Sequence, residues 1–255
     1  MKVLFIGDIV GRSGRKAVAS VLPALRSQLS WDLCLANAEN AAGGRGLTEA
    51  VANELLGLGI DILTMGNHTW DNKEIFKFID QAHYLVRPAN YPVEVPGKGY
   101  TIIEKRDKAI GIINLTGQAF MGPMQCPFAA INGILAELKG CDYIIIDFHA
   151  EATAEKAAMA YYLDGRVSAV LGTHTHIQTA DEQVLPEGTL YITDVGATAS
   201  IHSILGMEIE SVLPKFITKL PQRFSVAQGP SAFAAVWLDL DAKKIQRLSI
   251  LDPNQ

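Results

Sequence analysis

Two histidines, His174 and His176, follow an apolar run in the stretch VSAVLGTHTHIQTAD. The chain holds only six histidines, so a pair one residue apart suggests metal binding, for which imidazole is a common ligand. Because alternate residues of an extended segment point to the same side, both rings are expected to reach one centre. A solvent-exposed polar loop is the alternative interpretation of this pair.

Four further apolar runs also end at side chains that can bind metal. These ends are Asp8 after KVLFIG, Asn37, Glu39 and Asn40 after DLCLA, Asn67 and His68 after IDILTMG, and His149 after YIIIDF. Taken singly, each has an ordinary explanation as a turn residue, a polar loop or a hydrogen-bonded core histidine. Ligands of open α/β sheets bind at the carboxyl ends of the strands. If these runs are neighbouring parallel strands, all five ends meet at one edge and form a metal centre.

The elements that must position these residues follow a repeating pattern of apolar run, polar loop and helical segment. YTIIEK and AIGIINL are expected to form a hairpin, and FAAVWLDLD and KIQRLSIL a final antiparallel pair. Solid apolar runs indicate strands covered on both faces, so a layered α/β fold with mixed sheets is expected. Residues 1–255 contain no linker and are predicted to be one domain. Helices are expected at about 14–28, from Thr48 as N-cap to about Leu58, near Lys73–Asp80, and from about Ala152 to Leu163.

Composition excludes some classes of partner. The net charge is −5 and no block of Lys or Arg occurs, which disfavours binding to duplex nucleic acid. No apolar stretch approaches the ~20 residues of a membrane helix, so no membrane span is expected. Cys34, Cys126 and Cys141 are widely spaced and odd in number, which favours buried free thiols in a reducing compartment and a cytoplasmic location.

The glycines of the first loop allow a different interpretation. Gly7, Gly11 and Gly14 could cradle a phosphate, as in nucleotide-cofactor folds. Their spacing, GxxxGxxG, matches neither the dinucleotide fingerprint nor a Walker loop. Asp8 would also repel a bare phosphate unless a cation lay between them. Tight turns explain these glycines more simply.

The combined motifs resemble a known family. GD at 7–8, GNH at 66–68, His149 and G-x-H-x-H at 172–176 resemble the metallophosphoesterase (calcineurin-like) superfamily. The spellings GDIVGRSGR, NAENAAGG, GNHTWD, DFHAEAT and GTHTHIQTAD are similar to its YmdB-like branch. The resemblance implies a four-layer αββα sandwich of two mixed β-sheets flanked by helices. It also implies two metal ions and hydrolysis of phosphoesters.

The resemblance further assigns roles by position. His68 becomes the proton donor, and the metal ligands become Asp8, Glu39, Asn40, Asn67, His149, His174 and His176. The sequence departs from the wider superfamily twice. Asp8-Ile9-Val10 stands where D-x-H is usual, and Glu39 with Asn40 replaces the bridging aspartate. Both departures resemble the YmdB-like branch, and they weaken any transfer of substrate or metal preference from distant phosphatases.

The chemistry of such a centre follows from two ions ~3.5–4 Å apart, which clamp the attacking and leaving oxygens at phosphorus. Glu39 would bridge them; Asp8, Asn40 and His176 would complete one ion, and Asn67, His149 and His174 the other. A water between the ions would be deprotonated and attack. Ligation by nitrogen and oxygen suits divalent or trivalent iron, manganese or zinc, and the resemblance favours Fe or Mn.

Two acidic residues have open roles. Asp71 either orients His68 or begins the next helix, and the sequence slightly favours the helix start. Asp181 is a candidate partner for the histidines of THTH.

The preferred function is a dinuclear phosphodiesterase acting on small phosphodiesters, cyclic nucleotides above all. A phosphomonoesterase or nuclease on the same metal core is the first alternative, and a non-catalytic regulatory metal-binding protein is the second. The loop 116–128 carries Phe120, Met121, Met124 and Phe128. We expect it to be a lid or the interface of a homo-oligomer, with packing on its own core as the alternative.

Overall fold

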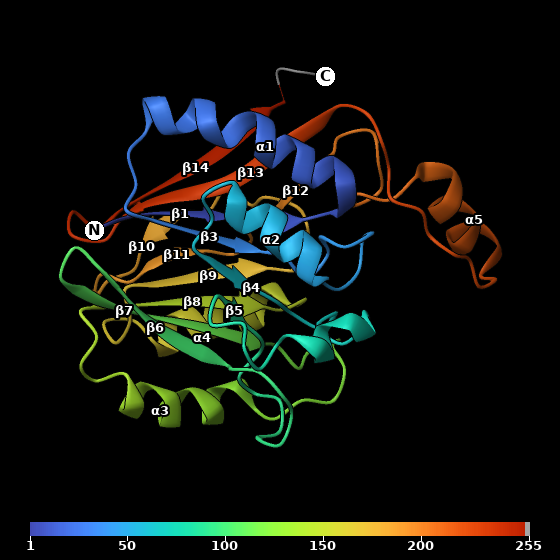
Figure 1. Cartoon of the computed structure of the whole chain (residues 1–255). Helices are drawn as coiled ribbons and strands as arrows, with labels where there is room; N and C mark the ends of the chain where they lie inside the picture. The colour runs from blue at the N-terminus through green and yellow to red at the C-terminus, as the bar shows by residue number, and fades with distance from the viewer. Residues whose placement is uncertain (253–255) are drawn as a thin grey trace.

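A computed structural model describes residues 1–252 of the chain (Figure 1). Two β-sheets pack face to face, and helices cover the outer face of each. Helices α1 (Gly11–Gln28) and α2 (Glu49–Gly57) cover the first sheet. Helices α3 (Pro127–Glu137) and α4 (Thr153–Tyr162) cover the second. The predicted four-layer αββα sandwich is therefore confirmed.

The first sheet has eight strands in the order β2-β12-β13-β1-β3-β4-β5, with β14 paired to β13. Strands β1, β3, β4 and β5 are parallel, and β13 is antiparallel to β1, so the sheet is mixed. The strands are β1 (Lys2–Ile6), β2 (Asp8–Ile9), β3 (Leu33–Asn37), β4 (Ile62–Thr64), β5 (Leu85–Val86), β12 (Ala197–Ser200), β13 (Ser231–Asp239) and β14 (Lys244–Leu251).

The second sheet has six strands in the order β10-β11-β9-β8-β7-β6. Strands β7, β8, β9 and β11 are parallel, while β6 and β10 are antiparallel edge strands. The strands are β6 (Tyr100–Lys105), β7 (Lys108–Thr116), β8 (Tyr143–His149), β9 (Ala169–Thr173), β10 (Gln183–Val184) and β11 (Leu190–Ile192).

The apolar run KVLFI explains why β1 is solidly hydrophobic. Val3 and Phe5 point into the core between the two sheets, and Leu4 and Ile6 point into the core beneath α1 and α2. Successive side chains of a strand alternate between its faces, so a strand covered on both sides needs apolar residues throughout.

Several predicted elements are confirmed. Thr48 caps α2 and its hydroxyl accepts a hydrogen bond from Val51 N at 3.2 Å. Strands β6 and β7 form the predicted hairpin, and Arg106 and Asp107 make its turn with φ of 50° and 58°. The final antiparallel pair is β13 and β14. The helix expected at Lys73–Asp80 is instead a short 3₁₀ helix, η1 (Lys73–Lys77).

Two helices were not predicted. Helix α3 begins at Pro127, a residue that suits the first turn of a helix, so Phe128 belongs to this helix and the loop ends at Cys126. Helix α5 (Ile209–Thr218) projects from the body of the molecule (Figure 1).

The glycines of the first loop serve packing. A Cβ at Gly7 would lie 1.9 Å from Gly196 O, and one at Gly14 would lie 2.2 Å from Thr198 O. The chain from Gly7 to the first turn of α1 therefore approaches the backbone around β12 as only glycine allows. Within residues 1–252, no helix combines the length and hydropathy needed to cross a membrane.

Candidate metal centre

The carboxyl ends of five strands meet at one edge of the sandwich. Three of them, β1, β3 and β4, belong to the first sheet, and β8 and β9 belong to the second. The five polar clusters therefore do not come from neighbouring strands of one sheet, as the sequence pattern alone suggested. They face one another across the boundary between two packed sheets.

His149, the last residue of β8, lies at the centre of this edge and is fully buried. Its Nε2 atom is 3.0 Å from each of three atoms: Asn67 Oδ1, Glu39 Oε1 and His174 Nδ1. Ligand atoms of Glu39, His149 and His174 lie within 4.8 Å of one another, close enough to share one metal ion.

A second group lies beside the first. His176 Nε2 is 3.2 Å from Asn40 Nδ2 and 3.8 Å from Asp8 Oδ1. The Asn40 amide also donates to Glu39 Oε1 at 3.2 Å. The Glu39 carboxylate thus touches a member of each group. All seven residues predicted as ligands gather at this edge.

Three observations indicate that the cluster fits a cation. Asp8 Oδ1 is buried without a hydrogen-bond partner among residues 1–252, while Oδ2 accepts from His174 N at 3.2 Å. A Cβ at Gly66 would lie 2.4 Å from Glu39 Oε2, so the backbone can pass here only because this residue is glycine. The donors are nitrogen and oxygen without thiolate, a set that suits divalent first-row metals.

The electrostatics of the cluster favour positive charge at its centre. Burial alone would lower the pKa of His149, but the carboxylates of Glu39 and Asp8 raise this pKa to about 9. Burial would likewise raise the pKa of Glu39, yet the charge on His149 lowers it to about 2. Burial and the charge on His149 lower the pKa of His174 to about 3. Burial raises the pKa of Asp8.

The two histidines after β9 are not held as the sequence pattern predicted. His174 and His176 have φ of 100° and 66°, so the segment is a turn rather than an extended strand. Asp194 fixes this turn because its Oδ2 accepts from Thr175 N at 3.0 Å and from Thr175 Oγ1 at 2.7 Å. Lys156 Nζ forms a buried ion pair with the same oxygen at 2.7 Å.

Asp181 does not contact these histidines, which corrects the role considered for it. Its carboxylate accepts hydrogen bonds from the backbone and the hydroxyl of Thr193 instead. Asp194, and not Asp181, is the carboxylate that hydrogen-bonds the turn between His174 and His176.

Asp147 was missed by the sequence analysis, although it lies two residues before His149. It accepts from Thr173 Oγ1 at 2.7 Å, and that hydroxyl lies 2.9 Å from His149 Nδ1. Burial raises the pKa of Asp147 to about 6. Asn37, at the end of β3, donates to Asp147 Oδ2 at 2.9 Å and supports the site from behind. A charged residue inside the apolar run YIIIDF was the available signal.

Glu151 was also missed. Its Oε2 atom lies 3.1 Å from His174 Nε2 at the open side of the cluster. No spacing pattern in the sequence marks this residue, because it follows the strand in an ordinary polar loop.

His68 is bound differently from the other histidines. Its backbone N–H donates to Glu39 Oε2 at 2.9 Å, and its Nδ1 lies 2.8 Å from Asp71 Oδ2. The cap of η1 is Asn72, whose side chain accepts from Glu74 N at 3.0 Å. The interpretation of Asp71 as a helix start is therefore wrong, and Asp71 orients the His68 ring.

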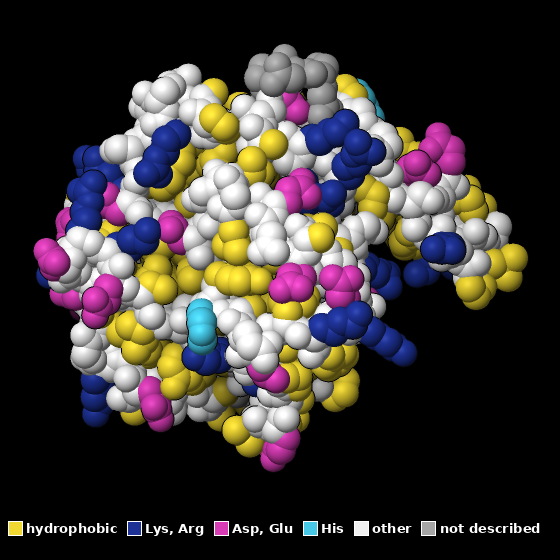
Figure 2. Space-filling view, viewed as in Figure 1, with side chains coloured by type: hydrophobic (Ala, Val, Ile, Leu, Met, Phe, Trp, Pro, Cys, Tyr) yellow, Lys and Arg dark blue, Asp and Glu magenta, His cyan; other side chains and the backbone are white. Residues whose placement is uncertain are grey.

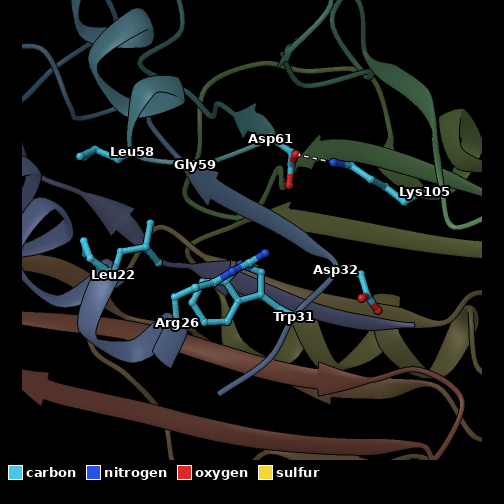
Figure 3. A pocket seen from close by; sticks show the side chains of 9 residues that line it. Leu22, Arg26, Trp31, Asp32, Leu58, Gly59, Asp61 and Lys105 are labelled. Atoms are coloured by element: carbon cyan, nitrogen blue, oxygen red, sulfur yellow. Dashed lines mark hydrogen bonds and ion pairs between the residues drawn. The ribbon is translucent and has the colours of Figure 1, made fainter. Parts of the chain in front are cut away.

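A cavity of about 310 Å³ opens above the cluster. Its floor carries Glu39, Asn40, His68, His174 and His176. Another cavity of about 310 Å³ lies among Arg26, Trp31, Asp61 and Lys105 (Figure 3). Asp61 precedes β4 and pairs with Lys105 at 2.8 Å, so this cavity lies at the amino ends of the strands. Of these two cavities, the one above the cluster lies at the carboxyl ends of the strands and is lined by candidate metal ligands.

Comparison with known proteins shows the family to which the chain belongs. Residues 4–251 match the family described as YmdB-like protein. The chain is 50% identical over 258 residues to the Bacillus subtilis (strain 168) protein named 2′,3′-cyclic-nucleotide 2′-phosphodiesterase, covering 99% of this chain and 98% of that one.

Two solved structures are similar throughout. A hypothetical protein from Thermus thermophilus has a TM-score of 0.95 and 44% identity, covering 99% of this chain and 100% of the other. A novel phosphatase from Mycoplasma pneumoniae has a TM-score of 0.92 and 32% identity, covering 100% and 95%.

The sandwich and its strand-end cluster define a member of the metallophosphoesterase superfamily. Within that superfamily, the chain belongs to the YmdB-like family, as the motifs predicted. It is an enzyme, a phosphoric diester hydrolase.

Proposed function

We propose that the enzyme is a dinuclear metal-dependent phosphodiesterase whose substrates are small phosphodiesters, specifically cyclic nucleotides. The observation that carries this proposal is the position of Glu39. Its carboxylate lies 3.0 Å from His149 in one group and 3.2 Å from Asn40 in the other. The name of the Bacillus subtilis relative supports 2′,3′-cyclic nucleotides as the substrate class.

The residues that would hold the metals fall into the two groups described above. One ion would be held by Asp8, Asn40 and His176. The other would be held by Asn67, His149 and His174, and Glu39 would contact both ions. The proposed metal is iron or manganese at both positions, and zinc would also suit these donors. When bound, two such ions polarise a phosphoryl group and lower the pKa of an attacking water. Other side chains hold these ligands in position. Thr173 hydrogen-bonds both His149 and Asp147, and Asp194 accepts from Thr175 between His174 and His176.

His68 would act as the general acid. Asp71 accepts at the Nδ1 side of the ring, which leaves Nε2 to give a proton to the departing ribose oxygen. For this transfer the ring must carry a proton on both nitrogens: Nδ1–H donates to Asp71, and Nε2–H is the proton given to the leaving oxygen. The His68 backbone N–H on Glu39 places the ring beside the cluster without making it a ligand.

We also propose that residues 1–255 work as one domain in the cytoplasm. The three cysteines are free thiols, which fits a reducing compartment. The expectation that all three are buried is wrong: Cys34 is buried, but Cys126 is exposed and Cys141 is half-buried.

A substrate panel tests the function. The purified enzyme with added Mn²⁺ would be assayed on 2′,3′-cyclic AMP, 3′,5′-cyclic AMP, 2′-AMP, 3′-AMP and duplex DNA. We expect kcat/KM to be highest for a cyclic nucleotide and turnover of duplex DNA to be undetectable. The matched control is the His174→Ala/His176→Ala variant prepared in parallel, which reports any contaminating phosphatase. Higher kcat/KM for the monoesters would overturn the proposal.

A further inference from the structure

The cavity above the cluster has two walls of different chemistry. Its floor is made of the carboxylate, amide and imidazole groups already described. A second part of its lining, which we call the apolar wall, consists of apolar side chains: Ile204, Leu205, Met207, Val212, Phe216 and Phe224. The remaining lining residues are Gly44, Arg45, Glu151 and Thr175. Metal binding and proton transfer require none of the apolar side chains. The apolar wall must therefore have another use or be covered by something else.

Most of this wall belongs to a projecting segment, residues 205–226, which we call the arm. Met207 closes its base through backbone bridges to Ile204 and Val226. Glu208 N donates to Ser225 O at 2.8 Å, and α5 lies between these two residues in the sequence. The arm is thus a built hairpin-like extension that leaves and re-enters the body at one place.

The base of the arm touches the loops that carry the candidate ligands. His176 Nδ1 donates to Leu205 O at 3.1 Å. A Cβ on Gly44 would lie 2.9 Å from Met207 Cε, so Met207 packs directly on the GGRG loop that follows Asn40. These contacts fix where the arm stands relative to the cluster.

The arm keeps apolar side chains in contact with solvent. Phe216 is 64% exposed, and Val212 is the buried residue of α5. Hydrophobic side chains are visible on the projecting arm in Figure 2. Lys215 Nζ lies 5.1 Å from the centre of the Phe224 ring, a cation–π contact that holds this ring in place.

We propose that the arm forms a nucleobase subsite in which Phe216 and Phe224 contact the flat face of the base. This inference rests on the proposed function. With the phosphate at the cluster, the ribose sets the base one sugar width away, where the apolar wall of the same cavity can receive it. A volume of about 310 Å³ is at the lower end of the range for small-ligand pockets, ~300–1,000 Å³. Aromatic faces stack on every base, so the subsite tolerates all four and favours the larger purines.

The test compares two substrates that differ only in the base. They are 2′,3′-cyclic AMP and the 2′,3′-cyclic phosphate of methyl β-D-ribofuranoside, which has no base. The wild-type enzyme should have the higher kcat/KM on 2′,3′-cyclic AMP. Phe224→Ala and Phe216→Ala should each reduce the ratio of the two kcat/KM values by about 10-fold, mainly through KM, the size expected for loss of one stacking contact.

The matched control is Ile217→Ala. Ile217 is 72% exposed on the same helix but does not line the cavity, so its replacement should leave the ratio as in the wild type. Phe216 and Phe224 lie outside the buried clusters, so their variants should fold. Light scattering of each variant would report whether the arm instead meets a second copy of the chain.

The outcomes separate the two proposals. Equal wild-type activity on both substrates, or an unchanged ratio in both Phe variants, would remove the subsite and leave the phosphodiesterase intact. Equal losses on both substrates together with a smaller particle would show that the arm is an interface between copies and would also remove the subsite. A wild-type enzyme that cleaves neither cyclic phosphate would remove the proposed function, and the subsite with it.

Discussion

His68 differs from its neighbours because its ring contacts Asp71 while its backbone contacts Glu39. This division predicts different consequences for adjacent substitutions. His68→Ala should keep the metals and reduce turnover by ~10²–10⁴-fold on a ribose leaving group, which needs a proton to depart. The loss should shrink for p-nitrophenolate, which leaves without one. Metal content and kcat on both leaving groups are the measurements.

Asn67→Ala is the matched variant for that test. Asn67 Oδ1 lies 3.0 Å from His149 Nε2, so its removal should lower metal occupancy and reduce turnover equally on both leaving groups. If His68→Ala loses a metal, or is equally impaired on both leaving groups, His68 is not the general acid.

The sequence could predict that the polar residues after the apolar runs lie close together, because the carboxyl ends of strands share an edge. It could not predict which other residues hold them in position. The turn at His174 and His176 depends on Asp194, which lies further along the chain beyond β11, so φ at these positions could not be read locally. Asp71 contacts His68 rather than capping η1 because Asn72 already caps it. Such choices depend on tertiary contacts that spacing does not encode.

At the scale of elements, the contact of α1 with β12 depends on a missing side chain. A Cβ at Gly14 would lie 2.2 Å from Thr198 O, a backbone atom that cannot move freely. Gly14→Ala should therefore destabilise the protein by ~1–3 kcal/mol through overpacking. The free energy of unfolding in urea is the measurement.

Gly133→Ala is the control for that substitution. Gly133 lies inside α3, and no heavy atom would come within 4 Å of its added Cβ. This variant should be stabilised by roughly 0.5–1 kcal/mol, because alanine is the better helix former. A Gly14→Ala variant as stable as the wild type would contradict the packing argument.

The main strands and the covering helices α1, α2 and α4 could be predicted because their apolar periodicity matches their burial. The covering helix α3 was not predicted, and helix α5 could not be. It contains Pro214, and its apolar residues Leu213, Phe216 and Ile217 remain exposed, so no pattern of core burial marks it. Its position depends on Met207 and Val226 at the base of the arm, which lie far apart in sequence.

At the scale of the whole molecule, the loop predicted at 116–128, which the structure confines to residues 117–126, is not a free lid. Asn90 Nδ2 donates to Thr116 O at 2.8 Å and to Gln125 O at 2.9 Å, which holds the loop near both ends. Phe120 at its tip is nevertheless 90% exposed. We therefore retain the proposal that this loop is an interface in a homo-oligomer.

Light scattering at high protein concentration tests this proposal. The wild type should have a mass above 27.6 kDa, and Phe120→Ser should lower that mass. Val93→Ser is the control, because Val93 is 86% exposed but lies outside the loop. A monomeric wild type would exclude the interface.

The metal content of the enzyme tests the central claim most directly. Elemental analysis of protein purified without chelators should find close to two transition-metal ions per chain, because two groups of ligands share Glu39. The His174→Ala/His176→Ala variant should lose both ions, since each ion would lose a direct ligand. A folded wild-type protein with close to zero bound metal would contradict the dinuclear centre and the mechanism proposed on it.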